Sequence, residues 1–272
     1  MAERSIKEDD PLDDFEHDTF THDGETKAVF RKGAGPGVVV ISEIPGVTPL
    51  VADFARRVVD LGCTVAMPSL FGTPGKEPSD AYAMRSMVGA CVSNEFACLA
   101  TGTTSPVTQW LRALAQDLHE RSGGPGVGVV GMCLTGGFAL AMMVDPVVVA
   151  PVLSQPSLPF AVGGKRKRDL GVSAADLELV KARIAEGACV LGLRFRKDPV
   201  VPGERFDRLR DELGDGFVAV ELDGDGNPDS KRPPHSVLTE DLVDEPGHET
   251  QAALQQVLDF FTDRLELAEP TP

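Results

Sequence analysis

The stretch Gly131-Met132-Cys133-Leu134-Thr135-Gly136-Gly137 decides the fold of this chain. It follows the apolar run 127–130 and precedes a helical pattern at 138–143. A strand that breaks at small residues, presents one nucleophile and continues as a helix is a nucleophile elbow. The nucleophile here is the thiol of Cys133. The turn predicts a sulfur above the sheet, beside a helix N-terminus whose dipole and free N–H groups favour a thiolate and an oxyanion.

Apolar runs and helical patterns alternate on both sides of this elbow. Strands are predicted at 27–32, 37–43, 63–67, 127–131, 147–153, 189–193 and 217–222, and helices at 49–61, 107–121, 174–186, 204–213 and 249–265. Such alternation is typical of a mostly parallel sheet with helices on both faces. The sequence has 272 residues and shows neither a fixed repeat nor a linker. We therefore expect an α/β fold with a single domain at 25–272, preceded by a flexible acidic extension at 1–24.

The charge of the chain limits its partners. Acidic residues number 42 against 26 basic residues, which gives a net charge of −16 at pH 7. This excess argues against nucleic acid and against an anionic membrane. The N-terminus is acidic where a signal peptide needs an apolar core, and the long uncharged run 122–144 is interrupted by the elbow. We expect a small-molecule substrate and a monomer or small homo-oligomer, with neither nucleic acid nor membrane as a partner.

The chain has five cysteines, an odd number without the paired spacing of a metal site. They stand at positions 63, 91, 98, 133 and 189. Cys91 and Cys98 lie in a stretch of mixed polarity, which favours packed thiols over zinc ligands. Because this usage is typical of a reducing compartment, we expect a cytoplasmic protein.

Two further patterns resemble cofactor motifs and are rejected. Residues 126–131 match G-x-G-x-x-G, but the pattern coincides with the predicted strand instead of following it. Residues 223–229 resemble the start of a calcium loop, but Pro228 stands where the sharp turn needs glycine and Pro234 where a bidentate glutamate is required. We therefore expect no metal and no organic cofactor, and we interpret 223–229 as a flexible acidic loop.

A catalytic thiol needs a base and an acid that orients the base. Asp198 follows the predicted strand 189–193, and His235 lies in the long loop after the last predicted strand. Parallel sheets place their sites at these carboxyl ends, and the chain order nucleophile, acid, histidine is that of α/β-hydrolases. His248 is the main alternative to His235, but it is predicted to begin the last helix. The remaining histidines lie before the domain or on a helix, at positions 17, 22 and 119.

These residues resemble the dienelactone hydrolase family. The resemblance is carried by Ser42-Glu43-Ile44-Pro45-Gly46, the elbow at 131–137, Asp198 and His235-Ser236, and it covers about residues 25–266 in family order. It implies an α/β-hydrolase fold and hydrolysis of a carboxylic ester or lactone, as in carboxymethylenebutenolidases, through a thioester intermediate. By this likeness Cys133, Asp198 and His235 form the triad, and Glu43 is an additional carboxylate that governs the resting thiol.

The resemblance also implies how substrate is held. The backbone N–H groups of Ile44 and Leu134 would form the oxyanion hole, which commonly supplies about 3–4 kcal/mol per donor. Substrate contacts are expected from Ser236 and, as a substitute for a family arginine, from Arg85 or the cluster 165–168. The segment 156–187, between the elbow helix and Asp198, looks longer than is usual in the family.

Two residues depart from the family pattern. Thr135 stands where the best-known members carry glycine, which predicts added strain in the elbow. Thr239 stands where those members carry an arginine that helps to bind the substrate carboxylate. These departures leave an alternative hypothesis open, in which the chain is a non-catalytic binding or regulatory member of the fold. Preferential alkylation of Cys133 over the other thiols would distinguish the enzyme from the binding protein.

Overall fold

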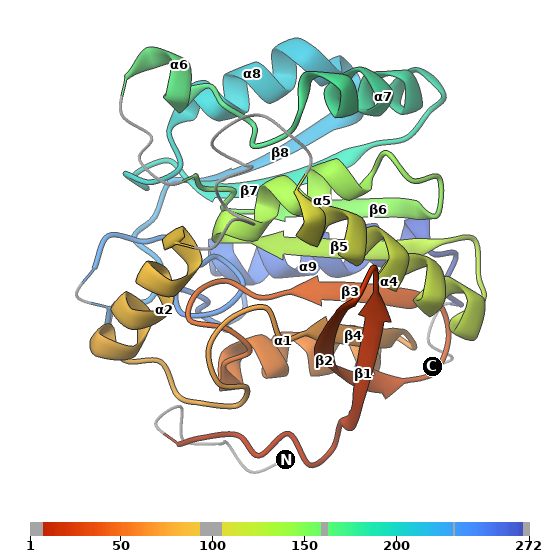
Figure 1. Ribbon diagram of the computed structural model, residues 1–272. Coiled ribbons are helices and arrows are strands. Elements are labelled where there is room, and N and C mark those ends of the chain that lie inside the picture. Colours follow the sequence, from red (N-terminus) through yellow and green to blue (C-terminus); the bar gives the residue numbers. More distant parts are fainter. Residues whose placement is uncertain (1–7, 93–104, 159–162, 231, 269–272) are drawn as a thin grey trace.

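The computed structural model describes residues 8–92, 105–158, 163–230 and 232–268, and its centre is one eight-stranded sheet (Figure 1). The strands are β1 Glu16–His22, β2 Glu25–Gly33, β3 Gly37–Ile41, β4 Thr64–Pro68, β5 Val127–Met132, β6 Val148–Ser154, β7 Val190–Phe195 and β8 Phe217–Leu222, in the spatial order β1-β2-β4-β3-β5-β6-β7-β8. The pairs β1–β2 and β2–β4 are antiparallel, and all other pairs are parallel. The prediction of a mostly parallel sheet is thus confirmed.

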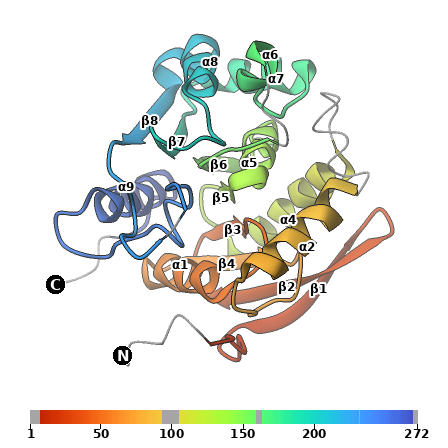
Figure 2. The ribbon, with the colours of Figure 1, turned by 90° about the vertical axis from the view of Figure 1, so that its left-hand side faces the viewer.

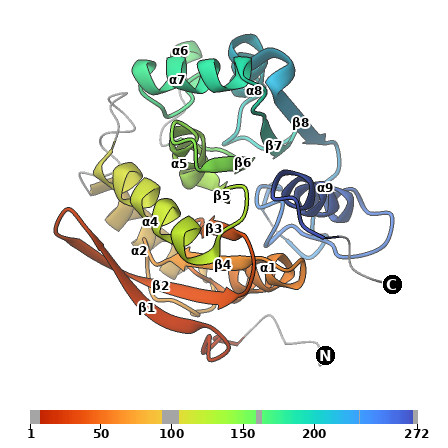
Figure 3. The same cartoon turned by 90° about the vertical axis from the view of Figure 1, so that its right-hand side faces the viewer.

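Helices cover both faces of this sheet. They are α1 Pro49–Asp60, α2 Asp80–Val92, α4 Pro106–Ser122, α5 Gly136–Met142, α6 Gly164–Lys167, α7 Ala174–Ala185, α8 Gly203–Leu213 and α9 Glu249–Arg264, with short 3₁₀ helices η1 Cys133–Thr135 and η2 Gly214–Gly216. Figures 2 and 3 show α1 and α9 on one face, and α4 and α5 on the other. No helix among the described residues is long and apolar enough to span a membrane.

Alternating side chains of the central strands divide the core into two. In β3, Val39 and Ile41 pack in the cluster that contains α4 and α5, whereas Val38 and Val40 pack in the cluster that contains α1 and α9. All four side chains are fully buried. Because successive residues of a strand point to opposite faces, a continuous apolar run can fill both layers.

The sheet begins earlier in the chain than we expected. We assigned residues 1–24 to a flexible extension, but residues 16–22 form β1, whose Phe20 meets Trp110 of α4 edge to face with centroids 5.3 Å apart. Leu12 and Phe15 are buried before it. The acidic composition of this segment made its apolar anchors hard to recognise in the sequence. In the fold, Arg56 forms ion pairs with two of the nearby carboxylates and so neutralises part of this charge. Residues 1–7 lie outside the described residues.

Two α-helices were not predicted, the four-residue α6 and the longer α2, and α2 lies beside the carboxyl ends of the parallel strands. This helix, α2, has a mixed sequence without a clear apolar face, and its Met84 is exposed. The side chain of Cys91 and the whole of Cys98 lie outside the described parts of the chain, so their interpretation as packed thiols stays a prediction.

Candidate active site

The elbow places Cys133 in a conformation that non-glycine residues rarely adopt. Its φ is +56°, at the point where β5 ends and η1 begins. A left-handed conformation costs a non-glycine residue about 1–3 kcal/mol, and the surrounding structure must impose it. Two glycines allow this tight turn. A Cβ atom on Gly131 would stand 2.2 Å from the Thr135 carbonyl oxygen, and one on Gly136 would stand 2.7 Å from the Cβ of Pro156.

Thr135 does not add the strain that the sequence predicted. Its φ of −87° and ψ of −5° are ordinary helical values, so the strain lies at Cys133 instead. The buried Thr135 hydroxyl accepts a hydrogen bond from the Met132 backbone N–H at 2.7 Å. Its Oγ1 also lies 3.0 Å from the carbonyl oxygen of Ile41, to which it can donate. Thr135 therefore ties the elbow to the neighbouring strand β3.

Asp198 and His235 meet at the carboxyl ends of β7 and β8. His235 Nδ1 lies 2.6 Å from Asp198 Oδ2, and the backbone N–H of Val200 donates to the other carboxylate oxygen at 2.8 Å. The Asp198 side chain is fully buried, while that of His235 is 22% exposed. Asp241 accepts hydrogen bonds from the backbone N–H groups of both His235 and Ser236, at 2.8 and 2.9 Å. The histidine is thus fixed through its ring and its backbone.

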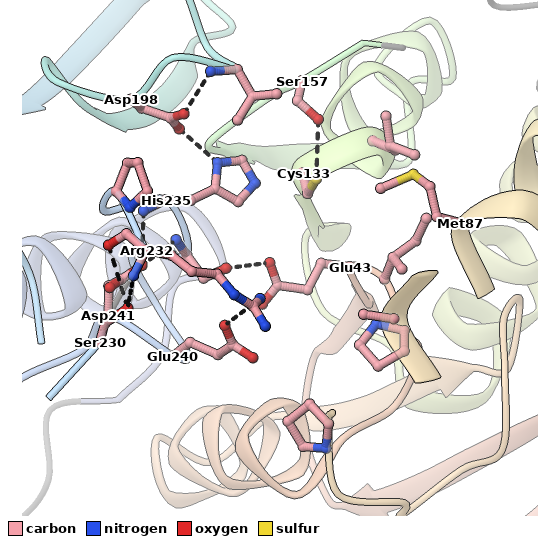
Figure 4. Close-up of a pocket in the computed structure, with 18 of the residues that line it drawn as sticks. Glu43, Met87, Cys133, Ser157, Asp198, Ser230, Arg232, His235, Glu240 and Asp241 are labelled. Carbon is pink, nitrogen blue, oxygen red and sulfur yellow. Dashed lines mark hydrogen bonds and ion pairs between the residues drawn. The ribbon is translucent and has the colours of Figure 1, made fainter. Parts of the chain in front are cut away.

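The charges around His235 favour its protonated form. Burial opposes the imidazolium, but the negative charge available at Cys133 and the hydrogen bond with Asp198 outweigh it and raise the pKa of His235 well above 6.5. Figure 4 shows the His235 ring between Asp198 and Cys133. An imidazole that holds its proton in this way can exchange protons with groups in the cavity as a general acid or base.

Ser157 is a neighbour of the thiol that the sequence did not point out. Its hydroxyl oxygen lies 3.0 Å from the sulfur of Cys133, and its backbone N–H donates to the Cys133 carbonyl at 3.0 Å. The preceding carbonyl, that of Pro156, accepts a 2.7 Å hydrogen bond from the buried guanidinium of Arg205. Burial lowers the pKa of Arg205 to about 10. The hydrogen bonds of Ser157 and Pro156 hold the loop after β6 against the elbow.

Glu43 lies at the carboxyl end of β3 and accepts hydrogen bonds from three neutral side chains. Gln155 donates to Oε2 at 3.1 Å and Ser236 donates to the same oxygen at 2.7 Å, while Thr239 donates to Oε1. Glu43 and its three donors are all buried. We call these four residues the Glu43 knot. The knot joins three chain segments, namely the loop after β3, the loop after β6 and the loop that carries His235.

These groups line one cavity of about 490 Å³ (Figure 4). Its lining contains all the catalytic and oxyanion-hole residues predicted from the sequence: Glu43, Ile44, Cys133, Leu134, Asp198 and His235. Ser236 also lines it, whereas Arg85 is exposed on α2 and does not. Arg232, which the sequence did not point out, is the arginine at the cavity. His248 caps the start of α9, as predicted, through the Thr250 backbone N–H.

The cluster 165–168 lies away from the cavity. Lys167 and Arg168 pair with Glu204 and Asp211 of α8, and none of the described residues of the cluster lines the cavity. The side chain of Lys165 lies outside the described atoms. This placement on the short helix α6 and its C-terminal cap, with ion pairs to α8, fits a solvated surface better than an anion site.

The comparisons with known proteins agree with this geometry. The model of the dienelactone hydrolase family matches residues 25–223. A provisionally assigned dienelactone hydrolase of Klebsiella pneumoniae subsp. pneumoniae MGH 78578 superposes with a TM-score of 0.64 at 19% identity, over 91% of this chain and 98% of the other. A dienelactone hydrolase-like promiscuous phosphotriesterase from metagenomic libraries gives 0.62 at 17% identity, over 92% and 98%.

A dienelactone hydrolase of Anabaena variabilis ATCC 29413 gives a TM-score of 0.57 at 16% identity, over 92% of this chain and 98% of the other. No curated protein matches the sequence. At these identities the solved structures establish the fold alone, and the predicted α/β-hydrolase fold is confirmed.

Proposed function

This chain belongs to the dienelactone hydrolase family, and we propose that it hydrolyses a carboxylic ester or lactone through a thioester on Cys133. Family membership supports a hydrolase for small-molecule esters. The observation that carries the finer proposal is the 2.6 Å contact of His235 Nδ1 with Asp198 Oδ2, in the cavity that also contains the strained Cys133. A carboxylate in this place holds the imidazole in the tautomer that carries its proton on Nδ1, which leaves Nε2 for proton transfer.

The first half-reaction makes the thioester. The Cys133 thiolate attacks the carbonyl carbon, and the carbonyl oxygen becomes an oxyanion that accepts hydrogen bonds from the N–H groups of Ile44 and Leu134. Leu134 lies in the first turn of η1, where N–H groups have no partner within the helix. As the tetrahedral intermediate collapses, the bond to the alkoxide breaks and His235 gives the alkoxide its proton.

The second half-reaction regenerates the thiol. A water molecule attacks the thioester while His235 takes one of its protons, and the carboxylic acid leaves as the C–S bond breaks. The released thiolate is then again paired with the imidazolium. Ser157 can stabilise the thiolate before acylation and after deacylation, because its hydroxyl can donate to the sulfur at 3.0 Å.

Glu43 acts on the triad through the loop that carries His235. The three donors of the knot occupy both of its carboxylate oxygens, and one of them is Ser236, the neighbour of His235. This arrangement supports a carboxylate that fixes the position of the histidine rather than one that takes the thiol proton directly.

Two experiments test the proposal. Cys133→Ala should abolish hydrolysis of 4-nitrophenyl acetate while circular dichroism and the melting temperature stay unchanged, and undiminished turnover would overturn it. Iodoacetamide at pH 6 should alkylate Cys133 much faster than Cys63 or Cys189 in the wild type. Equal, slow alkylation of the thiols would favour the non-catalytic binding protein.

A cytoplasmic location and a single domain stay predictions from the sequence.

A further inference from the structure

The cavity combines apolar walls with an excess of negative charge. Its lining includes apolar side chains from five parts of the fold, among them Ile44, Met87, Leu134, Leu158 and Val200. Three carboxylates outside the proposed triad also line it, those of Glu43, Glu240 and Asp241. Asp241 adds a buried oxygen, Oδ1, that no donor among the described residues meets.

The cationic side chains at the cavity are already matched by carboxylates. Among the described lining residues these are His235, which pairs with Asp198, and Arg232. Arg232 forms an ion pair with Asp80 at the start of α2, and its other terminal nitrogen lies 3.9 Å from a Glu240 oxygen. The positive charge of the guanidinium is therefore already shared between two anions of the protein, and a substrate carboxylate would compete with them for it.

At the position of the family arginine, this chain has a threonine with a different hydrogen-bonding role. Thr239 occupies it and donates to Glu43, so the place has a neutral hydroxyl that is already bonded. The next residue, Glu240, is 43% exposed, and its pKa is raised because partial desolvation and the nearby Glu43 charge both disfavour its ionised form. A further anion in this region would face the same repulsion.

We propose that this site selects uncharged esters with apolar acyl groups and discriminates against substrates that carry a carboxylate. This inference rests on the proposed hydrolase function and names its substrate class. An anion entering the cavity would lose hydration and meet three carboxylates, while the guanidinium of Arg232 is already shared. A neutral acyl chain would instead cover the apolar wall.

A pair of isosteric esters tests the proposal. The mono-4-nitrophenyl ester of adipic acid carries a carboxylate at its far end, and the corresponding ester of adipamic acid carries a neutral amide of the same shape. We expect kcat/KM to be at least tenfold higher for the amide, and the ratio to shrink as salt screens the charges. Equal rates, or preference for the carboxylate, would overturn the proposal but leave the hydrolase function intact. Hydrolysis of neither ester would instead count against the hydrolase function.

A single substitution checks that the cavity charge causes the preference. Glu240→Gln should raise the ratio of kcat/KM for the carboxylate ester to kcat/KM for the amide ester about threefold or more. Glu178→Gln on α7 is the matched control, because it removes the same charge from a side chain that is 71% exposed and does not line the cavity. Equal effects of the two variants would contradict the proposal, since only the net charge of the protein would then matter.

Discussion

Asp198 and Glu43 are two buried carboxylates of the same cavity, and they differ in what they hold. Asp198 contacts one group that can gain and lose a proton, the imidazole of His235, at 2.6 Å. Among the described residues, the hydrogen-bond donors to Glu43 are neutral groups, from Gln155, Ser236 and Thr239. One carboxylate therefore stabilises a charge that changes during the proposed reaction, and the other cross-links three loops.

This difference separates a carboxylate with a catalytic role from one with a structural role. A carboxylate bonded to an imidazole raises the basicity and sets the tautomer of that ring. A carboxylate bonded to hydroxyl and amide groups gains charge-assisted hydrogen bonds that strengthen the fold. Loss of Asp198 should thus reduce the rate more than loss of Glu43 does, whereas loss of Glu43 should cost more folding stability.

The largest expected effect is that of Asp198→Asn. The amide cannot hold the imidazolium, so kcat for 4-nitrophenyl acetate should fall about 10³-fold to 10⁴-fold. Initial rates at saturating substrate and matched enzyme concentrations would measure kcat, and denaturant unfolding would check that the fold is retained. A fall of less than tenfold would remove Asp198 from the triad.

The same variant changes the pH dependence of stability. The pKa of His235 is raised in the folded state, so its contribution to the free energy of unfolding is complete below about pH 6.5 and is lost as pH rises through the folded-state pKa. In Asp198→Asn the folded-state pKa of His235 should be lower, so this contribution should be smaller and its loss should be complete at lower pH. Titration of His235 by NMR with labelled histidine would follow the shift directly, and an unchanged pKa would show that Asp198 does not stabilise the imidazolium.

Glu43→Gln should have the next largest effect on rate. Its amide cannot accept all three hydrogen bonds, and a misplaced His235 loop should lower kcat/KM by about 10²-fold at most. The free energy of unfolding should fall by about 1–3 kcal/mol, measured in urea. If the rate fell as far as in Asp198→Asn with stability unchanged, Glu43 would be a direct proton acceptor and the contrast between the two carboxylates would fail.

Thr239→Val should produce a smaller change of the same kind. It keeps the shape of the side chain and removes one donor to Glu43, which should cost roughly 1.5 kcal/mol of folding stability. Thr239→Ser is the matched control, since it keeps the hydroxyl. Equal stability of the Val and Ser variants would mean that the Thr239 bond contributes nothing to the knot.

Ser157→Ala should give the smallest effect. Removal of a hydroxyl donor from the thiolate should cost about 1 kcal/mol, a roughly fivefold slower alkylation of Cys133 at pH 6. Ser157→Thr retains a hydroxyl and should alkylate at nearly the wild-type rate. An unchanged rate in the alanine variant would exclude Ser157 as a donor to the sulfur.

The elbow explains why much of the fold could be predicted. Local signals mark it: an apolar run, small residues, one nucleophile and a helical pattern, and Gly131 and Gly136 proved to be needed where the turn is tightest. The chain order of Cys133, Asp198 and His235 then identified residues that meet in one cavity. Strand β1 was missed because its alternation is weak in an acidic segment.

The Glu43 knot could not be predicted in the same way. Glu43 and Thr239 are separated by 196 positions, and no periodicity or motif relates a threonine to a carboxylate so far along the chain. The sequence identified Thr239 only by the arginine that it replaces. Ser157 and Arg232 were missed for the same reason, because single polar residues in loops carry no local pattern.

The most direct test of the central claim is to trap the acyl group. Acid quench of the enzyme during the first turnovers of 4-nitrophenyl acetate, followed by intact mass and peptide mapping, locates it, since an activated leaving group makes deacylation the slow step. We predict one acetyl group per chain, on Cys133, released by hydroxylamine as a thioester is. An acetyl group on Ser157 or on any other residue, or steady turnover with no acetyl group on Cys133, would contradict the account.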